Sequence, residues 1–198
     1  MQLYREALKG IIMLRCEWVG SDPLYVEYHD KEWGVPLHDD RRLFEFLVLE
    51  GAQAGLRWIT VLKKRANYHK AMAGFNPYII AKYKDKDIKR LLADEGIIRN
   101  RLKVESSIQN AKAVIEVIRE YGSFNSYLWE NIGGKPIVNK YKSTSEIPAY
   151  NVAAEQLSHN FKDQGFNFVG SKIVYSFMQA AGLVNDHITS CFRYKDLV

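Results

Sequence analysis

Cysteine and histidine, the residues of many structural zinc sites, occur as one pair near each end of this 198-residue chain. Cys16 and His29 lie near the start, and His187 and Cys191 lie near the end. Two cysteines and two histidines suffice for tetrahedral zinc, and an ion held by all four would pin one end of the fold to the other. The spacing of His187 and Cys191 places both on one face of a helix or turn.

The two cysteines leave other chemistry open. They are the only cysteines in the sequence, and they could form a disulfide or stay as unpaired buried thiols. A disulfide is disfavoured, because no signal peptide opens the chain and basic chains with few cysteines are usually intracellular. No C-x₂-C pair supports the zinc interpretation either. The spacing by itself therefore does not decide between zinc ligands and free thiols.

Glu50 is a carboxylate on a face that is otherwise apolar. The pattern predicts a helix that begins near Asp40, and the same face carries Leu43, Leu47 and Ala54. A buried carboxylate is unfavourable unless it is paired or hydrogen-bonded. Glu50 is therefore either partly exposed near the helix end or aimed into a pocket, for which the small residues that follow it leave room.

Aromatic residues are dense near the N-terminus. Trp18, Tyr25, Tyr28 and Trp33 fall within sixteen residues, and Trp58 follows the stretch of small residues after Glu50. Rings at this density usually form part of a core. Several rings beside one carboxylate would also make a pocket that stacks on a planar or cationic ligand.

Residues 94–101, with the sequence DEGIIRNR, carry a turn and a positive charge. Gly96 permits a tight turn, and Arg99, Arg101 and Lys103 are basic. Free backbone N–H groups at the start of the next helix can bind a phosphate group. An ordinary corner between two helices, with solvated arginines, would give the same pattern.

The elements that must position these residues are mostly helices. Apolar residues recur at helical spacing over 43–54, 58–62, 88–92, 104–118, 153–161 and 173–181. Gly122 is placed to end the fourth of these helices, and Ser171 and Gly182 are expected to flank the last. Residues 135–139 are expected to form a brief extended piece. These patterns predict a single all-α protein without internal repeats.

Composition narrows the function classes. Hydrophobic residues make up 47% of the chain, so a sizeable core is possible without disulfides. The apolar runs are short and interrupted by charge, which excludes a membrane-spanning helix of ordinary length. A net charge of +5 favours a polyanionic partner. The sequence contains no P-loop and no G-x-G-x-x-G after a strand, so nucleotide folds of those kinds are not expected.

Four segments together resemble the constitutive type I 3-methyladenine DNA glycosylases of the helix-hairpin-helix superfamily. They are CEWVGSDPLYVEYHDKEWGVP (16–36), LEGAQAGLRWITVLKKR (49–65), DEGIIRNRLKVESSIQNA (94–111) and GFNFVGSKIVYSFMQAAGLVNDHITSC (165–191). The resemblance runs from Cys16 to Cys191, which is nearly the whole chain. The motifs are long and occur in the same order.

The resemblance implies an all-α, two-lobed helix-hairpin-helix DNA glycosylase fold with the base pocket between the lobes. Residues 13–198 would form one glycosylase domain, preceded by an N-terminal extension at 1–12, and the helix-hairpin-helix would span about 86–118. One structural zinc would join the segments 16–29 and 187–191 as a clasp. Its implied ligands are Cys16, His29, His187 and Cys191.

The resemblance also assigns residue roles. Glu50 would be the catalytic acidic residue at the base pocket. The base-binding aromatics would be Trp18, Tyr25, Tyr28 and Trp58. The hairpin that contacts the DNA backbone would comprise Gly96, Ile97, Ile98, Arg99 and Arg101.

The implied function is DNA base excision repair. The enzyme would flip 3-methyladenine out of alkylated double-stranded DNA, hydrolyse its N-glycosidic bond and release the free base. Relatives that also cut the strand carry a nucleophilic lysine just after the hairpin glycines, where this chain has Asn100, so a monofunctional enzyme that leaves an abasic site is expected. We expect a monomer without a membrane partner, in the bacterial cytoplasm at the nucleoid.

One departure from the family and two other functions bear on this prediction. Arg57 stands where the family usually has a small polar residue, directly before Trp58, and this departure bears on the fine substrate range.

A zinc-stabilised nucleic-acid-binding module without catalysis is a second hypothesis for the function. A hydrolase with catalytic zinc is a third, and it requires an open coordination position that four protein ligands do not leave.

Overall fold

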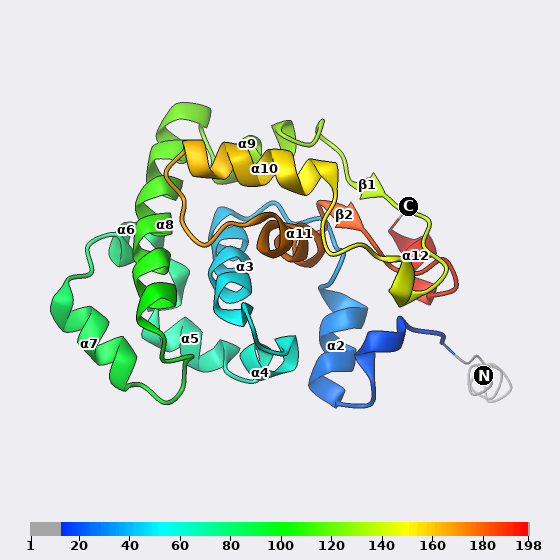
Figure 1. Ribbon diagram of the computed structural model, residues 1–198, viewed down its shortest axis with the longest axis horizontal. Coiled ribbons are helices and arrows are strands. Elements are labelled where there is room, and N and C mark those ends of the chain that lie inside the picture. Colours follow the sequence, from blue (N-terminus) through cyan, green and yellow to red (C-terminus); the bar gives the residue numbers. More distant parts are fainter. Residues whose placement is uncertain (1–12, 198) are drawn as a thin grey trace, which may run out of the picture.

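The computed structural model describes residues 13–197, so the predicted extension at 1–12 lies outside the described residues. The described chain is mostly helical, as expected (Figure 1). Its α-helices are α2 (Pro23–Lys31), α3 (Asp40–Gln53), α4 (Trp58–Leu62), α5 (Arg65–Ala71), α6 (Pro77–Ile80), α7 (Asp85–Ala93), α8 (Arg101–Tyr121), α9 (Phe124–Glu130), α10 (Val152–Asp163), α11 (Ser171–Ala180) and α12 (Phe192–Asp196). Short 3₁₀ turns occupy η2 (Glu17–Val19), η3 (Ala73–Phe75) and η4 (Thr144–Glu146).

Helix α3 lies at the centre of the molecule (Figure 1). It packs against α8, α9 and α11, and every residue from Leu43 to Ala52 is buried. The side chain of Asp39 caps its N-terminus by accepting a hydrogen bond from the backbone N–H of Arg42. The predicted helix is therefore confirmed, with its cap one residue earlier than the expected start near Asp40.

The long helix α8 stands beside α3 and meets α7 through the turn at 94–100 (Figure 1). Asn100 caps its start, because its side chain accepts from the backbone N–H of Lys103 at 3.1 Å. The helix ends at Gly122, whose φ of 83° is unfavourable for other residues. The predicted end of this helix is confirmed.

Two short strands join distant parts of the chain. Strand β1 (Ile137–Val138) lies within the expected extended piece at 135–139 and pairs in parallel with β2 (Val184–Asn185). Ile137 pairs with Val184 in this register. The pairing holds the segment after α9 beside the segment that leads to His187.

The segment 34–37 packs on the end of α11. The backbone N–H of Gly34 donates to Gln179 at 2.9 Å, and that of Leu37 donates to Ala181 at 3.1 Å. A Cβ on Gly182 would lie 2.2 Å from the carbonyl carbon of Val35, so glycine is required for this approach. These contacts bring the N-terminal segment against the C-terminal one.

Two details differ from the sequence expectation. The N-cap of α11 is Gly170, and Ser171 is the first helical residue, so the predicted cap was wrong by one position. Helices α2, α5, α6, α9 and α12 were not predicted at all. Within residues 13–197, no helix is both long and apolar enough to cross a membrane.

Candidate functional site

A cavity of about 350 Å³ brings together Glu50 and all four aromatic residues predicted to bind a base. Helices α2, α3 and α4 with the turn η2 form one side of it, and α11 with the loop at 144–149 forms the other. Its lining residues are Trp18, Tyr25, Tyr28, Trp33, Glu50, Gln53, Trp58, Thr144, Ile147, Pro148, Ala149, Tyr175, Ser176 and Gln179.

Glu50 lies in the last turn of α3 and is 4% exposed. No backbone or side-chain group of residues 13–197 donates a hydrogen bond to its carboxylate, and burial is the sole cause of its pKa shift. Burial alone raises the pKa of Glu50 to about 8, so the free protein holds this carboxyl mostly protonated at neutral pH. Of the two interpretations of Glu50, the structure supports the carboxyl in a pocket.

The aromatic rings act both as core and as cavity wall. Tyr28 and Trp58 are buried, with ring centroids 5.4 Å apart. Trp18 and Tyr25 are partly exposed, with centroids 5.0 Å apart. The indole N–H of Trp58 is buried without a hydrogen-bond partner among the described residues. The cavity therefore offers flat aromatic faces around one carboxyl group.

The sequence did not reveal the opposite wall of the cavity. Tyr175, Ser176 and Gln179 reach it from α11, where the apolar pattern indicated an ordinary core helix. Gln179 is held in place because its amide donates to Asp186 at 2.8 Å. The loop at 144–149 completes the wall, and its sequence TSEIPA gave no signal of a site.

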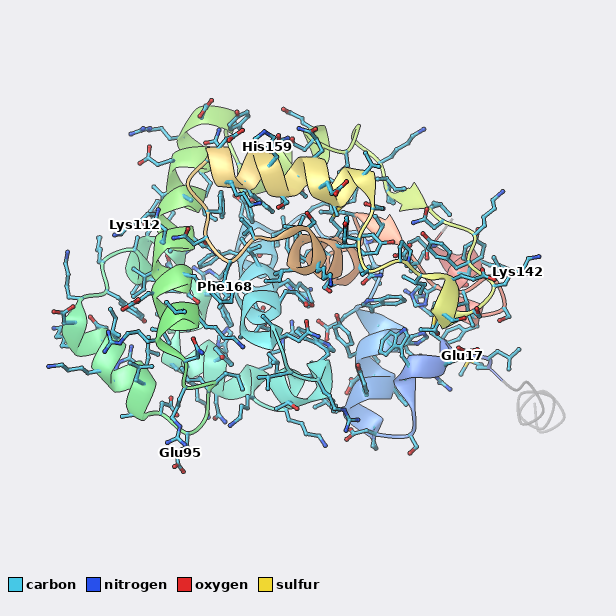
Figure 2. The ribbon with its side chains drawn as sticks, in the orientation of Figure 1. Glu17, Glu95, Lys112, Lys142, His159 and Phe168 are labelled. Atoms are coloured by element: carbon cyan, nitrogen blue, oxygen red, sulfur yellow. The ribbon has the colours of Figure 1, made fainter. Side chains whose placement is uncertain are left out.

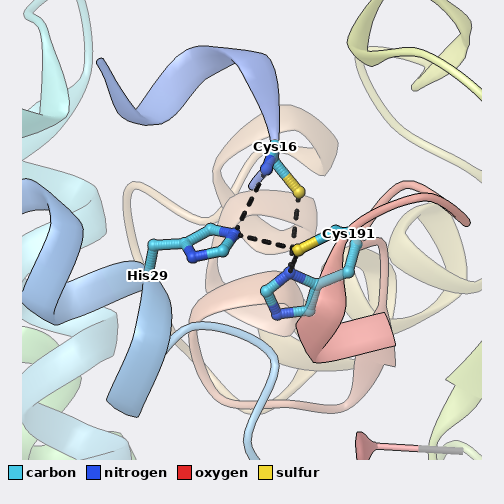
Figure 3. A group of neighbouring side chains, drawn as sticks. Cys16, His29 and Cys191 are labelled. Carbon is cyan, nitrogen blue, oxygen red and sulfur yellow. Dashed lines mark hydrogen bonds between the residues drawn. The ribbon is translucent and has the colours of Figure 1, made fainter. Parts of the chain in front are cut away.

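The four predicted zinc ligands meet at one point. Cys16, His29, His187 and Cys191 are all buried, and their ligand atoms lie within 4.8 Å of one another. Cys191 Sγ is 3.5 Å from His29 Nε2 and 3.5 Å from His187 Nδ1 (Figure 3). No disulfide joins the two cysteines.

Neighbouring groups orient the two imidazoles toward this centre. Asp30 lies 2.8 Å from Nδ1 of His29, and Arg15 in turn donates to Asp30 at 2.7 Å. The backbone carbonyl of Trp33 lies 3.0 Å from Nε2 of His187. Each histidine thus presents its other nitrogen to the centre, as metal-binding histidines with such partners do.

The electrostatics of the cluster favour one thiolate. A hydrogen bond from Cys16 lowers the pKa of the Cys191 thiol despite its burial, and hydrogen bonds from His187 and His29 lower it further. The pKa of Cys16 is raised, because the hydrogen bond to Cys191 and burial both favour its protonated form. Thiolates and neutral imidazoles are the forms that bind zinc.

The cysteine–histidine cluster shares a wall with the cavity. The ring of Trp18 lies 5.4 Å from that of His29, and the ring of Trp33 lies 4.6 Å from that of His187. Both tryptophans line the cavity. The residues of this cluster therefore also pack against two of the rings that line the cavity.

The turn at 94–100 is braced by α5. The backbone N–H of Ile98 donates to the hydroxyl of Tyr68 at 3.0 Å, and Lys64 donates to the carbonyl of Glu95 at 2.5 Å. A Cβ on Gly96 would lie 2.9 Å from Cβ of Asn67, so glycine is needed for this close packing. Glu95 points outward from the tip of the turn (Figure 2).

The predicted hairpin residues differ in exposure. Ile97 is buried, while Arg99 and Arg101 are exposed and pair with Glu95 and Glu105 in the geometry of surface ion pairs. Exposed pairs of this kind are weak, so both arginines can exchange partners. The side chain of Asn100 is occupied as the cap of α8.

Arg57 lies close enough to Tyr25, a residue of the cavity wall, for its charge to act on that side chain. It is exposed, and it directly precedes Trp58, the first residue of α4. Burial raises the pKa of Tyr25, and the positive charge of Arg57 partly opposes that rise. A cation therefore stands beside one of the rings that line the cavity.

Comparisons with known proteins agree with this geometry. A family model described as methyladenine glycosylase matches residues 18–194. DNA-3-methyladenine glycosylase 1 of Escherichia coli (strain K12) is 48% identical over 182 residues, covering 92% of this chain and 97% of that protein. A crystal structure of 3-methyladenine DNA glycosylase I has a TM-score of 0.88 at 50% identity and covers 90% of this chain and 98% of its own.

A second solved structure shows a ligand. It is a 3-methyladenine DNA glycosylase I variant in complex with 3-methyladenine, with a TM-score of 0.87 at 38% identity over 90% of this chain and 96% of that one. Fold, length and sequence thus agree over nearly the whole chain. The chain therefore belongs to the methyladenine glycosylase family, and within it to the type I 3-methyladenine DNA glycosylases.

Proposed function

We propose that the protein flips 3-methyladenine out of alkylated double-stranded DNA, hydrolyses the N-glycosidic bond and leaves an abasic site. The observation that carries this proposal is the buried carboxyl of Glu50, which receives no hydrogen bond from residues 13–197 and faces a cavity walled by aromatic rings. A base with an exocyclic amine would supply the missing donor.

The chemistry of the substrate reduces what the enzyme must do. Adenine alkylated at N3 carries a positive charge within the nucleotide, so it is already a good leaving group. The protein must extrude the nucleotide and hold the base while the C1′–N9 bond breaks. Electron-rich rings attract such a cation by about 0.5–2 kcal/mol each.

Glu50 adds selectivity. When a cationic base enters, its charge favours the ionised carboxylate, and Glu50 releases its proton to solvent water. The carboxylate then accepts a hydrogen bond from the exocyclic amine. A base that presents a carbonyl at that position would place two acceptors face to face, which is unfavourable.

We infer that the enzyme is monofunctional. Asn100 cannot form a Schiff base, and its side chain already caps α8. Lys103 is the next lysine along the helix, and its ammonium donates to two backbone carbonyls. Neither group is free to attack the sugar.

Chromatography of the bases released from methylated duplex DNA tests this function. We expect free 3-methyladenine from methylated DNA and none from untreated DNA. Borohydride added during the reaction should trap no covalent enzyme–DNA adduct. A trapped adduct would disprove the monofunctional mechanism, and damage-independent binding without release would support a binding module instead.

We propose that the turn at 94–101 contacts the DNA backbone as the hairpin of a helix-hairpin-helix. Arg99→Ala combined with Arg101→Ala should weaken duplex binding about equally for all sequences. It should also reduce the slope of log affinity against log salt by about two, because two phosphate contacts are lost. Fluorescence anisotropy at several salt concentrations measures this slope, and an unchanged slope would place the contacts elsewhere.

We also propose that the cysteine–histidine cluster holds one structural zinc ion, whose chemistry is to cross-link the chain ends. Four protein ligands close a tetrahedral site and leave no position for a catalytic water. The lobe division, the single domain at 13–198, the monomeric state and the cytoplasmic location stay predictions.

A further inference from the structure

Lys103 makes contacts that its place in the basic turn did not suggest. The sequence places it with Arg99 and Arg101 as a cation that could meet DNA phosphate. Its ammonium instead donates to the carbonyl of Ala52 at 2.8 Å and to that of Ala54 at 2.7 Å. Lys103 is partly buried, whereas Arg99 and Arg101 are exposed.

The two carbonyls belong to the end of α3 and to its C-cap. Carbonyls at a helix end have no partner within the helix, and a cation near them is favourable. Lys103 supplies that partner from the first turn of another helix, α8. It therefore ties the start of α8 to the end of α3.

The chain around these carbonyls connects two residues that line the cavity, Gln53 and Trp58, and we call residues 53–57 the rim segment. Glu50 lies in the last turn of α3, and Gln53 lines the cavity. The following residues lead through Leu56, which is 39% exposed, to Trp58 in the cavity wall. A shift of this segment would move the rim relative to the turn at 94–100.

We propose that Lys103 is a positioning residue that sets the rim segment 53–57 against the hairpin, so that a duplex held by the hairpin delivers its extruded nucleotide to the cavity. The inference rests on the proposed function. Lys103 touches neither base nor phosphate in this arrangement. Its effect is on the step between duplex binding and bond cleavage.

Lys103→Met tests the proposal, because it keeps the length of the side chain and removes the donors. We expect the single-turnover rate at saturating enzyme to fall about 10- to 100-fold, since a misplacement of about 1 Å has effects of this size. The dissociation constants for free 3-methyladenine and for a duplex with an abasic-site analogue should stay within about twofold.

A weakened base pair distinguishes a positioning role of Lys103 from a purely structural one, because only a positioning role makes the loss of rate depend on how easily the base is extruded. An oligonucleotide with a single adenine is methylated and annealed opposite thymine or opposite cytosine. Extrusion of a mismatched base requires less energy, so the mismatch should restore a larger share of the rate in Lys103→Met than in wild type. Equal fractional losses on both duplexes, with a lower melting temperature, would show a structural role only and overturn the proposal.

Two further variants complete the test. Lys112→Met is the control, because it removes an exposed lysine on the solvent side of α8 (Figure 2). This variant should keep the single-turnover rate within about twofold of wild type. Lys103→Arg keeps donors for both carbonyls and should retain most of the rate even if Lys103→Met does not fold. A rate for Lys103→Arg as low as that of an unfolded sample, or an unchanged rate in Lys103→Met, would contradict the proposal. Absence of release by wild type would instead refute the proposed function.

Discussion

Glu50→Gln should lower kcat/KM for 3-methyladenine release about 10- to 100-fold, because a hydrogen bond to a charged group is worth about 1.5–3 kcal/mol. Glutamine keeps the size of the side chain and an acceptor oxygen, but it cannot carry the negative charge that attracts a cationic base. Chromatographic release assays on methylated duplex DNA measure the loss. Glu120→Gln, an exposed change on α8, is the matched control and should have no effect.

The same residue should set a pH dependence. Burial raises the pKa of Glu50 to about 8, and recognition of the cation uses the ionised form. Because kcat/KM reports the free enzyme, it should rise with pH by about 10- to 100-fold in all as Glu50 ionises, and level off above pH 8. Glu50→Gln should show a flat profile over this range. A flat wild-type profile would contradict the role of Glu50.

The free energy of unfolding should fall as the pH rises, whereas kcat/KM rises. The folded protein holds the Glu50 proton more tightly than the unfolded chain, whose pKa is near 4.5. Ionisation therefore opposes folding, and stability falls as the pH rises from 4.5 through 8. Glu50→Gln removes this penalty and should be more stable than wild type by about 3 kcal/mol at pH 7. Urea unfolding at pH 5 and pH 8 measures the difference, which should be larger at pH 8.

Cys16→Ser should cause the largest loss of stability, because it removes one of four ligands that join the chain ends. Structural zinc contributes about 10 kcal/mol or more to folding in small zinc peptides, and a whole domain is stable by about 5–15 kcal/mol. We expect the variant to lose bound zinc and to melt at a markedly lower temperature. Plasma mass spectrometry and thermal denaturation measure both effects.

The controls for this prediction use another histidine and a chelator. His159→Ala changes an exposed histidine on α10 and should leave zinc content and melting temperature unchanged (Figure 2). A strong chelator should destabilise wild type but not Cys16→Ser. An unchanged melting temperature in Cys16→Ser would refute the zinc clasp. Since Trp18 and Trp33 link the cluster to the cavity, loss of zinc should also weaken 3-methyladenine binding.

The central helices could be predicted from the sequence, because burial of one helix face requires apolar residues at helical spacing. Helices α3 and α8 bury a continuous face, so their apolar residues recur at helical spacing and their ends carry Asp39, Asn100 and Gly122. The same logic revealed Glu50 as a carboxyl on a buried face. The cysteine and histidine pairs were identified by residue type and by resemblance, and the fold brings all four together.

Other features depend on tertiary contacts that no local pattern records. Helix α2 spans nine residues and carries cavity aromatics in place of a simple apolar stripe. Helix α6 spans four residues, which is too short for periodicity to show. The wall formed by Tyr175 and Gln179 depends on the way α11 packs on α3. Lys103 resembled a phosphate ligand because its partners, two backbone carbonyls, leave no mark in the sequence.

The most direct test of the central claim compares two bases released from the same methylated duplex at pH 8. Methylated DNA contains 3-methyladenine, which presents an exocyclic amine, and 7-methylguanine, which presents a carbonyl at the corresponding position. Wild type should release 3-methyladenine and leave 7-methylguanine, and Glu50→Gln should lose most of the 3-methyladenine release. Equal release of both bases by wild type, or unchanged release by a folded Glu50→Gln variant, would contradict the claim that Glu50 selects the base in this pocket.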